Sequence, residues 1–221
     1  MNTAILIPAR LDSTRFPNKM LAELNGVPLI QRVYEKCKQS GLPTYVVTPD
    51  EGIKELIGKD TILVGDAENG TARCALAADY VNYEYFINVQ GDMPDITSDI
   101  ILKVNELLNE YDVVTPYTKM SNEQRSDPNS VKIIHNGRTA KWFGRGITGY
   151  GDHHLGVYGY KNYLLNSYSS LKVYPEEQIE QLEQLRWIQN DVTIGVVEVE
   201  FKGVEINTQE DLNTWHKNKP L

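Results

Sequence analysis

A short apolar run meets a charged loop in AILIPARLDSTRFPNK, residues 4–19. The run AILI (4–7) predicts a buried strand, because it is short and wholly apolar. The loop after it concentrates positive charge and holds a single acid, with Arg10, Arg15, Lys19 and Asp12. In an open α/β sheet, ligands bind where strands end and the chain turns into helices. We therefore expect this loop to lie at a binding site.

Beyond this loop the chain alternates strand-like apolar runs with helical stretches, which favours a sheet with helices on both faces. Further strands are expected at 44–48, 61–64 and 85–90. Helices are expected at 28–41, 51–58, 71–81 and 98–111. Thr71 is the expected cap of the third helix, and Ser98 or Asp99 would start the fourth. This half of the chain predicts a doubly wound, mostly parallel α/β arrangement.

The later half of the chain has a less regular pattern. Strands are expected at 112–118, 131–135, 139–143, 154–160 and 192–199. The 3.6-residue period predicts one continuous helix over 176–189, and a closing helix over 208–217 would be capped by Thr208. No repeat, linker or low-complexity tract divides the sequence. We expect one domain, whose later half elaborates the sheet and supplies the pocket of a second substrate.

The composition excludes several classes of partner. The chain has 221 residues and a net charge of −8, and phosphate-neutralising nucleic-acid binders usually have a basic surplus, so we expect no nucleic-acid partner. No uncharged run approaches the length of a membrane span, and the N-terminus lacks a signal-peptide pattern, so we expect no membrane association. Cys37 and Cys74 are isolated in the sequence, which favours reduced thiols in a cytoplasmic protein.

The charged loop matches neither common phosphate-binding fingerprint, since GxGxxG and GxxxxGK[ST] are both absent. It could still hold a triphosphate. Arginine gives bidentate donors to phosphate oxygens and lysine gives a mobile charge, and the loop adds the hydroxyls of Ser13 and Thr14. A solvated surface loop would have the same composition, so the charges alone leave both interpretations open.

A second motif, VQGDMP (89–94), ends a predicted strand with Gln90, Gly91 and Asp92. Mg²⁺ prefers one or two carboxylates, with its other positions filled by waters and phosphate oxygens. Asp92 at a strand end, facing a loop of arginines and lysine, fits that preference. A turn aspartate after a strand is the alternative, and this motif alone does not decide between them.

Together these motifs resemble the sugar-activating cytidylyltransferases, and best the 3-deoxy-manno-octulosonate (Kdo) cytidylyltransferase family, the CMP-Kdo synthetases. The resemblance runs in order along nearly the whole chain. Its segments are IPARLDSTRFPNKMLAELNGVPLIQRV (7–33), ENGTAR (68–73), VQGDMP (89–94), DPNSVKII (127–134), KWFGR (141–145), HLGVYGYK (154–161), EEQIEQLEQLR (176–186) and GVEINTQEDL (203–212).

The resemblance implies a single Rossmann-like nucleotidyltransferase domain over residues 1–221, with a mostly parallel twisted sheet flanked by helices. The N-terminal half would bind nucleotide, and residues 112–207 would bind sugar and form dimer contacts. It implies transfer of a cytidylyl group from CTP to the anomeric hydroxyl of Kdo, or of a close relative such as an amino-sugar variant, with release of pyrophosphate. The cofactor would be Mg²⁺. The enzyme would be a cytoplasmic homodimer that supplies an activated acidic keto-sugar for lipopolysaccharide or capsule.

The resemblance also implies roles for individual residues. Arg15, Lys19 and Asp92 would be catalytic: the cations neutralise phosphate charge as pyrophosphate departs, and Asp92 binds the metal. The nucleotide-binding residues would be Ala9, Arg10, Ser13, Thr14, Arg15, Lys19, Arg73 and Gln90. The sugar-binding residues would be Arg145, His154, Tyr158, Glu183 and Gln184, with Arg145 as a partner of the sugar carboxylate.

Two of these assignments have structural alternatives. Glu183 and Gln184 are neighbours on the expected helix and point about 100° apart, so at most one can aim straight into a pocket. Tyr158 and Tyr160 share one face of a strand, so an ordinary packed pair would explain them as well.

Four departures from the family pattern keep two other hypotheses open. Met93 replaces a carboxylate beside Asp92, Ala72 replaces another, the segment between Arg145 and His153 is short, and Asn207 replaces a metal-binding aspartate. An amide oxygen ligates Mg²⁺ without charge and usually more weakly, but Glu205, two residues earlier, would share a face with Asn207 in a strand and could take over the carboxylate role. The expected metal set is therefore Asp92, Glu205 and Asn207. The alternatives are a cytidylyltransferase for a nonulosonic acid and a catalytically impaired homologue that binds nucleotide.

Overall fold

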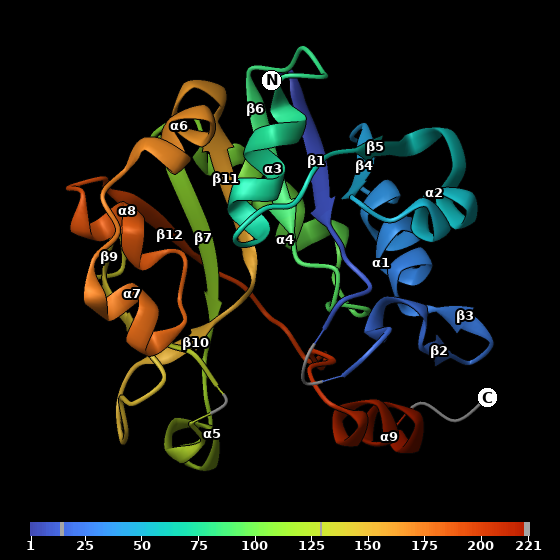
Figure 1. The fold of residues 1–221 in the computed structure, drawn as a ribbon. Helices are drawn as coiled ribbons and strands as arrows, with labels where there is room; N and C mark the ends of the chain where they lie inside the picture. Colours follow the sequence, from blue (N-terminus) through green and yellow to red (C-terminus); the bar gives the residue numbers. More distant parts are fainter. Residues whose placement is uncertain (14–15, 129, 219–221) are drawn as a thin grey trace.

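The computed structural model describes residues 1–13, 16–128 and 130–218, and Figure 1 shows how their helices and strands are arranged. The strands of the first half are β1 (Thr3–Pro8), β2 (Glu23–Leu24), β3 (Val27–Pro28), β4 (Thr44–Thr48), β5 (Thr61–Leu63) and β6 (Tyr85–Val89). Its α-helices and short 3₁₀ helices are η1 (Lys19–Leu21), α1 (Leu29–Lys38), α2 (Glu51–Ile57), η2 (Gly58–Asp60), α3 (Gly70–Ala78) and α4 (Ser98–Leu107).

The later half continues the sheet and ends on a helix. Its strands are β7 (Val113–Thr118), β8 (Lys132–His135), β9 (Ala140–Gly144), β10 (Asp152–His154), β11 (Val157–Lys161) and β12 (Ile194–Glu198). Its helices are α5 (Asn122–Ser126), α6 (Asn162–Ser167), η3 (Tyr168–Ser170), α7 (Pro175–Glu180), α8 (Leu185–Gln189) and α9 (Gln209–Asn218).

Within the described residues, ten strands join into one sheet in the order β5-β4-β1-β6-β11-β7-β10-β8-β9, with β12 paired to β7. Strands β5, β4, β1 and β6 are parallel, which confirms the doubly wound first half. Strand β11 enters antiparallel between β6 and β7, and the rest of the sheet is mixed. The predicted α/β fold with helices on both faces is confirmed.

The sheet splits where β10 meets β11, and this split positions the candidate site. Strand β7 lies along one side of both, while on the other side β8 pairs with β10 and β6 pairs with β11. The amide of Gln90 donates to the carbonyl of Gly156 at 3.1 Å on one edge of the gap, and the amide of His154 donates to the carbonyl of Val131 at 3.0 Å on the other. The carboxyl end of β6 therefore opens toward the amino end of β8.

The core has a layer on each side of the sheet, and β1 contributes to both. Ile5 and Ile7 pack among apolar residues of α1, α4 and α9, while Ala4 and Leu6 pack among those of α3. Burying one such branched side chain contributes about 1.5–3 kcal/mol relative to leaving it exposed, so AILI anchors the strand firmly between two layers. The predicted buried strand is confirmed, and it fixes the start of the charged loop.

The continuous helix predicted over 176–189 is wrong. Helix α7 ends at Glu180, Gln181 adopts a left-handed conformation with φ of 53°, and α8 begins only at Leu185. The predicted strand 154–160 is also divided, since β10 ends at His154 and β11 begins only at Val157.

One predicted helix cap is corrected as well. Asn69, not Thr71, caps α3: its side-chain oxygen accepts a hydrogen bond from the amide of Ala72 at 2.9 Å. Helix α4 begins at Ser98, as predicted, and Thr97 before it supplies no side-chain cap. For α9 the predicted cap is present, because the hydroxyl of Thr208 accepts a hydrogen bond from the amide of Asp211 at 3.2 Å.

Candidate active site

The charged loop is tied to its neighbours on both flanks. The amide of Ala9 donates to the carbonyl of Val47 at 2.9 Å, and the amide of Leu11 donates to the Asp50 carboxylate at 2.9 Å. Arg10, between these anchors, faces a cavity that Ala9 and Ser13 also line. The predictions for Thr14 and Arg15 lie outside the described residues.

Arg73 supports this loop from helix α3. Its side chain is buried, and its guanidinium donates to the carbonyl of Ala9 at 3.4 Å. Burial and the nearby charge of Arg10 lower the pKa of Arg73. The end of β1 is therefore an electropositive place, where two guanidinium groups converge on the same cavity.

Lys19 and Asp92 meet across this cavity. The Nζ of Lys19 lies 2.8 Å from Oδ2 of Asp92, and the lysine is buried. The cavity that they line with Arg10, Ser13, Arg73 and Gln90 has a volume of about 250 Å³. Asp92 therefore faces the cationic loop, as the sequence predicts.

The C-terminal motif comes to the same place. The amide of Ile206 donates to the backbone carbonyl of Asp92 at 2.9 Å, which sets Glu205 and Asn207 beside the end of β6. Glu205, Asn207 and Asp92 line one cavity. Burial, followed by the charge of Asp92, raises the pKa of Glu205 to about 7. The two carboxylates thus lie close enough to repel each other.

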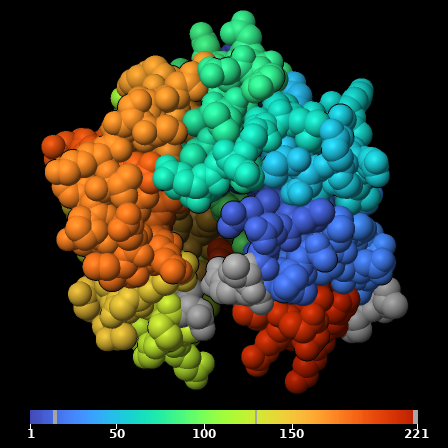
Figure 2. Space-filling view, viewed as in Figure 1, coloured from blue at the N-terminus to red at the C-terminus, as the bar shows by residue number. Residues whose placement is uncertain are grey.

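The sugar-side residues line this cavity too, which has a volume of about 640 Å³ and adjoins the first one through Arg10, Gln90 and Asp92. Figure 2 shows the surface hollowed between the orange later half and the blue N-terminal segments. The structure brings together all five predicted sugar-binding residues, Arg145, His154, Tyr158, Glu183 and Gln184.

Lys132 fixes the backbone of Arg145. It is fully buried, and its Nζ donates to the carbonyl of Arg145 at 2.8 Å as well as to the carbonyls of Asp127 at 2.7 Å and Ser130 at 2.9 Å. The amide of Arg145 donates to the Glu180 carboxylate at 2.7 Å. The predicted partner of the sugar carboxylate therefore stands on a held segment of chain.

Glu183 joins the two halves of the site. Its carboxylate accepts hydrogen bonds from the amide of Thr71 at 3.1 Å and from the side chain of Gln90 at 3.4 Å. Burial raises the pKa of Glu183, although the hydrogen bonds from Thr71 work against it. Both Glu183 and its neighbour Gln184 line the cavity, because the turn between α7 and α8 removes the 100° offset expected on a helix.

Aromatic contacts fix the remaining side chains. The His154 ring lies 5.0 Å from Phe143 in an edge-to-face arrangement and 5.3 Å from Tyr158. Burial lowers the pKa of His154 to about 3, so the imidazole is neutral near pH 7. Tyr158 stacks on Tyr160 at 5.9 Å, so it packs as a pair and also lines the cavity.

Sequence reasoning missed Asn69 and Gly70, which line both cavities. A Cβ at Gly70 would stand 2.9 Å from the side-chain nitrogen of Gln90, so a larger residue at the start of α3 would push the Gln90 side chain aside. The signal was present in ENGTAR, where an Asn-Gly pair precedes the alanine-rich helix.

Two departures from the family pattern concern the core rather than the site. Met93 is fully buried and packs in the layer under α1 and α4, while Ala72 is buried in the opposite layer. The departure at Asn207 does concern the site, because Asn207 lines the larger cavity.

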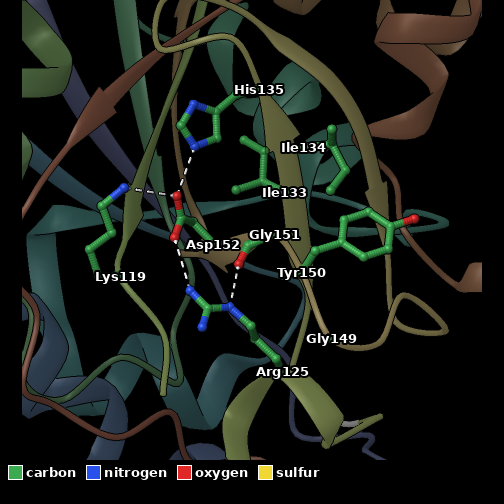
Figure 3. A pocket seen from close by; sticks show the side chains of 9 residues that line it. All are labelled: Lys119, Arg125, Ile133, Ile134, His135, Gly149, Tyr150, Gly151 and Asp152. Atoms are coloured by element: carbon green, nitrogen blue, oxygen red, sulfur yellow. Dashed lines mark hydrogen bonds and ion pairs between the residues drawn. The ribbon is translucent and has the colours of Figure 1, made fainter. Parts of the chain in front are cut away.

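A separate cavity of about 570 Å³ opens beside β8 and β10 (Figure 3). Its carboxylate, Asp152, lies 3.0 Å from both Lys119 and His135 and 3.9 Å from Arg125. Burial works to raise the pKa of Asp152, but hydrogen bonds from His135 and Lys119 outweigh it and hold the pKa below its usual range. These charges satisfy one another, and none of the predicted site residues lies there.

In the described part of the chain, no helix is long and apolar enough to cross a membrane.

Comparisons with known proteins agree with this geometry. The family model described as cytidylyltransferase matches residues 4–194. The 3-deoxy-manno-octulosonate cytidylyltransferase of Rickettsia rickettsii is 37% identical over 95% of this chain and 93% of its own length. The enzyme of the same name from Rickettsia typhi is also 37% identical, over 96% of this chain and 94% of its own length. A solved CMP:2-keto-3-deoxy-manno-octonic acid synthetase complexed with CTP superposes with a TM-score of 0.91 at 29% identity, covering 99% of this chain and 98% of that one. The inositol-1-phosphate CTP transferase of T. maritima, at 16% identity and a TM-score of 0.69 over 100% of this chain and 98% of its own, shares the fold.

Proposed function

This chain belongs to the family of 3-deoxy-manno-octulosonate cytidylyltransferases, and from its site we propose that it transfers a cytidylyl group from CTP to the anomeric hydroxyl of Kdo. The anomeric oxygen bonds to the α-phosphorus, the bond from that phosphorus to the bridging oxygen breaks, and pyrophosphate departs with loss of the hydroxyl proton. The observation that carries the proposal is the convergence of a cationic loop, the two carboxylates of Asp92 and Glu205, and a second polar cavity at one split of the sheet.

On the nucleotide side, Arg10, Lys19 and Arg73 would bind the triphosphate, with Arg15 added from the same loop. Phosphoryl transfer of this kind depends on holding the reacting groups in line and on neutralising phosphate charge. Lys19 pairs with Asp92 at 2.8 Å and can move toward a phosphate oxygen when another cation takes the carboxylate.

On the sugar side, Arg145 would pair with the sugar carboxylate, while His154, Tyr158 and Gln184 would contact sugar hydroxyls. Glu183 orders the cavity from the α7–α8 turn, since its carboxylate is held by Thr71 and Gln90. These contacts would orient the anomeric hydroxyl toward the α-phosphate.

The residues present fit a divalent cation. Asp92 and Glu205 face one cavity with the Asn207 amide, and the raised pKa of Glu205 reflects its burial first and the charge of the nearby Asp92 carboxylate second. The residues that the structure describes contain no cluster of three His, Cys, Asp or Glu that could hold a metal alone. Waters and phosphate oxygens would complete the shell, as Mg²⁺ prefers. Bound Mg²⁺ would neutralise phosphate oxygens and orient the substrates.

The wider setting is also proposed. The N-terminal half would bind nucleotide and residues 112–207 would bind sugar within one domain, and the enzyme would act as a homodimer. Both cysteines, Cys37 and Cys74, are free and buried, which suits a reducing compartment such as the cytoplasm, where an activated sugar for lipopolysaccharide or capsule would be made.

The test is pyrophosphate release with CTP, Mg²⁺ and a panel of acidic sugars. Release with Kdo and not with nonulosonic acids is expected. Release only with a nonulosonic acid would overturn the proposed acceptor. Binding of CTP in calorimetry without turnover on any sugar would instead identify a chain that has lost catalysis.

A further inference from the structure

We infer that Thr115 is a positioning residue that fixes the tautomer of His154, so that Nδ1 of His154 accepts a hydrogen bond from a hydroxyl of the acceptor sugar. The second part of this inference rests on the proposed function, and the first does not. Thr115 belongs to none of the motifs that the sequence singled out.

The contacts of the Thr115 hydroxyl set the proton positions. Thr115 is fully buried in β7, and its Oγ1 lies 2.8 Å from the carbonyl oxygen of Val157 and 3.0 Å from Nε2 of His154. A threonine hydroxyl has one hydrogen to donate, and a carbonyl oxygen can only accept. Because the hydrogen goes to Val157, Nε2 must be the donor to Oγ1.

A proline explains why the hydroxyl is committed to Val157. Gly159 of β11 stands opposite Val114 of β7, and this antiparallel register places Val157 opposite Pro116. Proline has no N–H, so β7 cannot supply the usual backbone donor to the Val157 carbonyl. The Thr115 hydroxyl supplies it instead, and without it a buried carbonyl would lose its donor.

The tautomer leaves one ring nitrogen for a ligand. With the proton on Nε2, Nδ1 of the neutral imidazole carries a lone pair and accepts. Phe143 and Tyr158 hold the ring from two sides, and the ring lines the larger cavity. Among the described residues, the hydrogen bonds of the His154 ring are confined to the one at Nε2. The low pKa of His154 agrees with a ring that stays neutral.

This arrangement gives the site a defined preference. A neutral acceptor at Nδ1 pairs with a hydroxyl hydrogen, and it disfavours a substrate that presents only an acceptor or an apolar group at that position. The preference belongs to the sugar cavity and leaves CTP binding unaffected.

The first experiment measures the tautomer directly in the wild-type protein. The chain has 4 histidines, so ring ¹⁵N–¹H spectra of protein labelled in histidine are simple, and loss of signals in His154→Gln assigns the ring. We expect a protonated Nε2 and a bare Nδ1. A proton on Nδ1 would overturn the inference, and this measurement requires neither a substrate nor a Thr115 variant.

The second experiment measures kinetics in Thr115→Val and Thr115→Ser. Valine keeps the shape and removes the hydroxyl, so we expect the KM for the sugar to rise about tenfold, equivalent to about 1.4 kcal/mol, with the KM for CTP unchanged. Serine restores the hydroxyl and should restore the KM. An unchanged sugar KM in Thr115→Val, with the wild-type tautomer retained, would overturn the inference.

A matched control separates tautomer from stability. Thr44 is a buried strand threonine in β4 whose hydroxyl donates to the Leu42 carbonyl at 2.9 Å, far from the sugar cavity. Thr44→Val should lose comparable stability without any change in the sugar KM. If the wild-type chain releases no pyrophosphate with any sugar, the proposed function fails, while the tautomer measurement still decides the role of Thr115.

Discussion

At the scale of single residues, Asp92 is where the two halves of the candidate site meet. Its carboxylate pairs with Lys19, its backbone carbonyl binds Ile206, and it stands near Glu205. Asp92→Asn keeps the shape and removes the charge, so turnover should fall about a hundredfold or more, as when one group that stabilises the transition state is lost. Steady-state pyrophosphate release measures this. Asp99→Asn, on the exposed start of α4, is the control that should keep full activity, and near-wild-type turnover of Asp92→Asn would place the metal elsewhere.

Glu205 and Asn207 give a paired prediction about the metal. Glu205→Gln removes the only other carboxylate of the proposed set and should weaken Mg²⁺ binding to the CTP complex about tenfold or more, since charged oxygen ligands bind Mg²⁺ more strongly than amides. Asn207→Asp adds a carboxylate and should strengthen it. Titration of Mg²⁺ into protein with CTP in a calorimeter gives both affinities. Equal Mg²⁺ affinities in the wild type, Glu205→Gln and Asn207→Asp would contradict the assignment of these two positions.

His154 makes stability depend on pH. Burial lowers its pKa to about 3, with the charges of His153 and Arg145 acting in the same direction. The unfolded imidazole binds a proton near its ordinary pKa of about 6.5, so the unfolded state gains protons first as the pH falls. The contribution of His154 to the free energy of unfolding is therefore complete above pH 6.5 and declines below it. The loss between pH 7 and pH 5 should be about 2 kcal/mol. Urea unfolding at both pH values measures the difference.

The control for this prediction is a histidine on the surface. His216 is only partly buried at the end of α9, so His216→Gln should keep the wild-type difference between pH 7 and pH 5. His154→Gln should reduce that difference by about 2 kcal/mol, whatever its absolute stability. An undiminished difference in His154→Gln would show that other groups cause the acid sensitivity.

At the scale of elements, Asn69 at the start of α3 both caps the helix and contacts the buried Tyr168. Asn69 accepts from the amide of Ala72 at 2.9 Å and donates to the Tyr168 hydroxyl at 2.9 Å. Asn69→Ala should lower the free energy of unfolding by about 1–2 kcal/mol, because the cap alone is worth about 1 kcal/mol. Thermal or urea unfolding gives the value. Asn69→Ser keeps a capping oxygen and should lose less, and equal losses would rule out the cap as the cause.

The same elements show how far the sequence predicts this molecule. Strands such as AILI and the first-half helices follow from apolar period alone, because local pattern and buried face coincide there. The turn at Gln181 does not follow, since the apolar residues of 176–189 keep helical spacing, although the chain turns there and Glu183 accepts a hydrogen bond from the distant Thr71 amide. Thr115 could not be found either: its role depends on the register that sets Val157 opposite Pro116. The charged loop and Asp92 were predicted as binding residues from their places after strands, whereas the sugar-side residues were predicted only because they repeat a family pattern.

At the scale of the whole molecule, a buried ion pair joins α7 to α8 within the later half, and its arginine also reaches the first half through an exposed contact. The Arg186 side chain is 3% exposed and pairs with Glu177, at 8%, and with Glu68, at 51%, on the segment before α3. Burial works to lower the pKa of Arg186, but hydrogen bonds to Glu177 and Glu68 outweigh it and raise it. The exposed Glu68 contact is screened by water and is worth less than about 1 kcal/mol, so Glu177 is the main partner.

Arg186→Met should therefore destabilise the entire chain by about 3–5 kcal/mol, because Glu177 would be left buried without a cation. Strand β7 pairs with both β10 and β11, so one hydrogen-bonded sheet connects β5 to β9 past the split, and we expect both halves to lose stability together. Native-state hydrogen exchange of amides in β1 and in β8 measures the two halves separately, and both should lose protection by the same free energy. Replacing Glu177 by Leu in the same chain removes the unpaired charge and should recover much of the loss. Loss of protection confined to β8 and β9 would mean that the halves unfold independently and that the two cavities of the candidate site rest on separate units of stability.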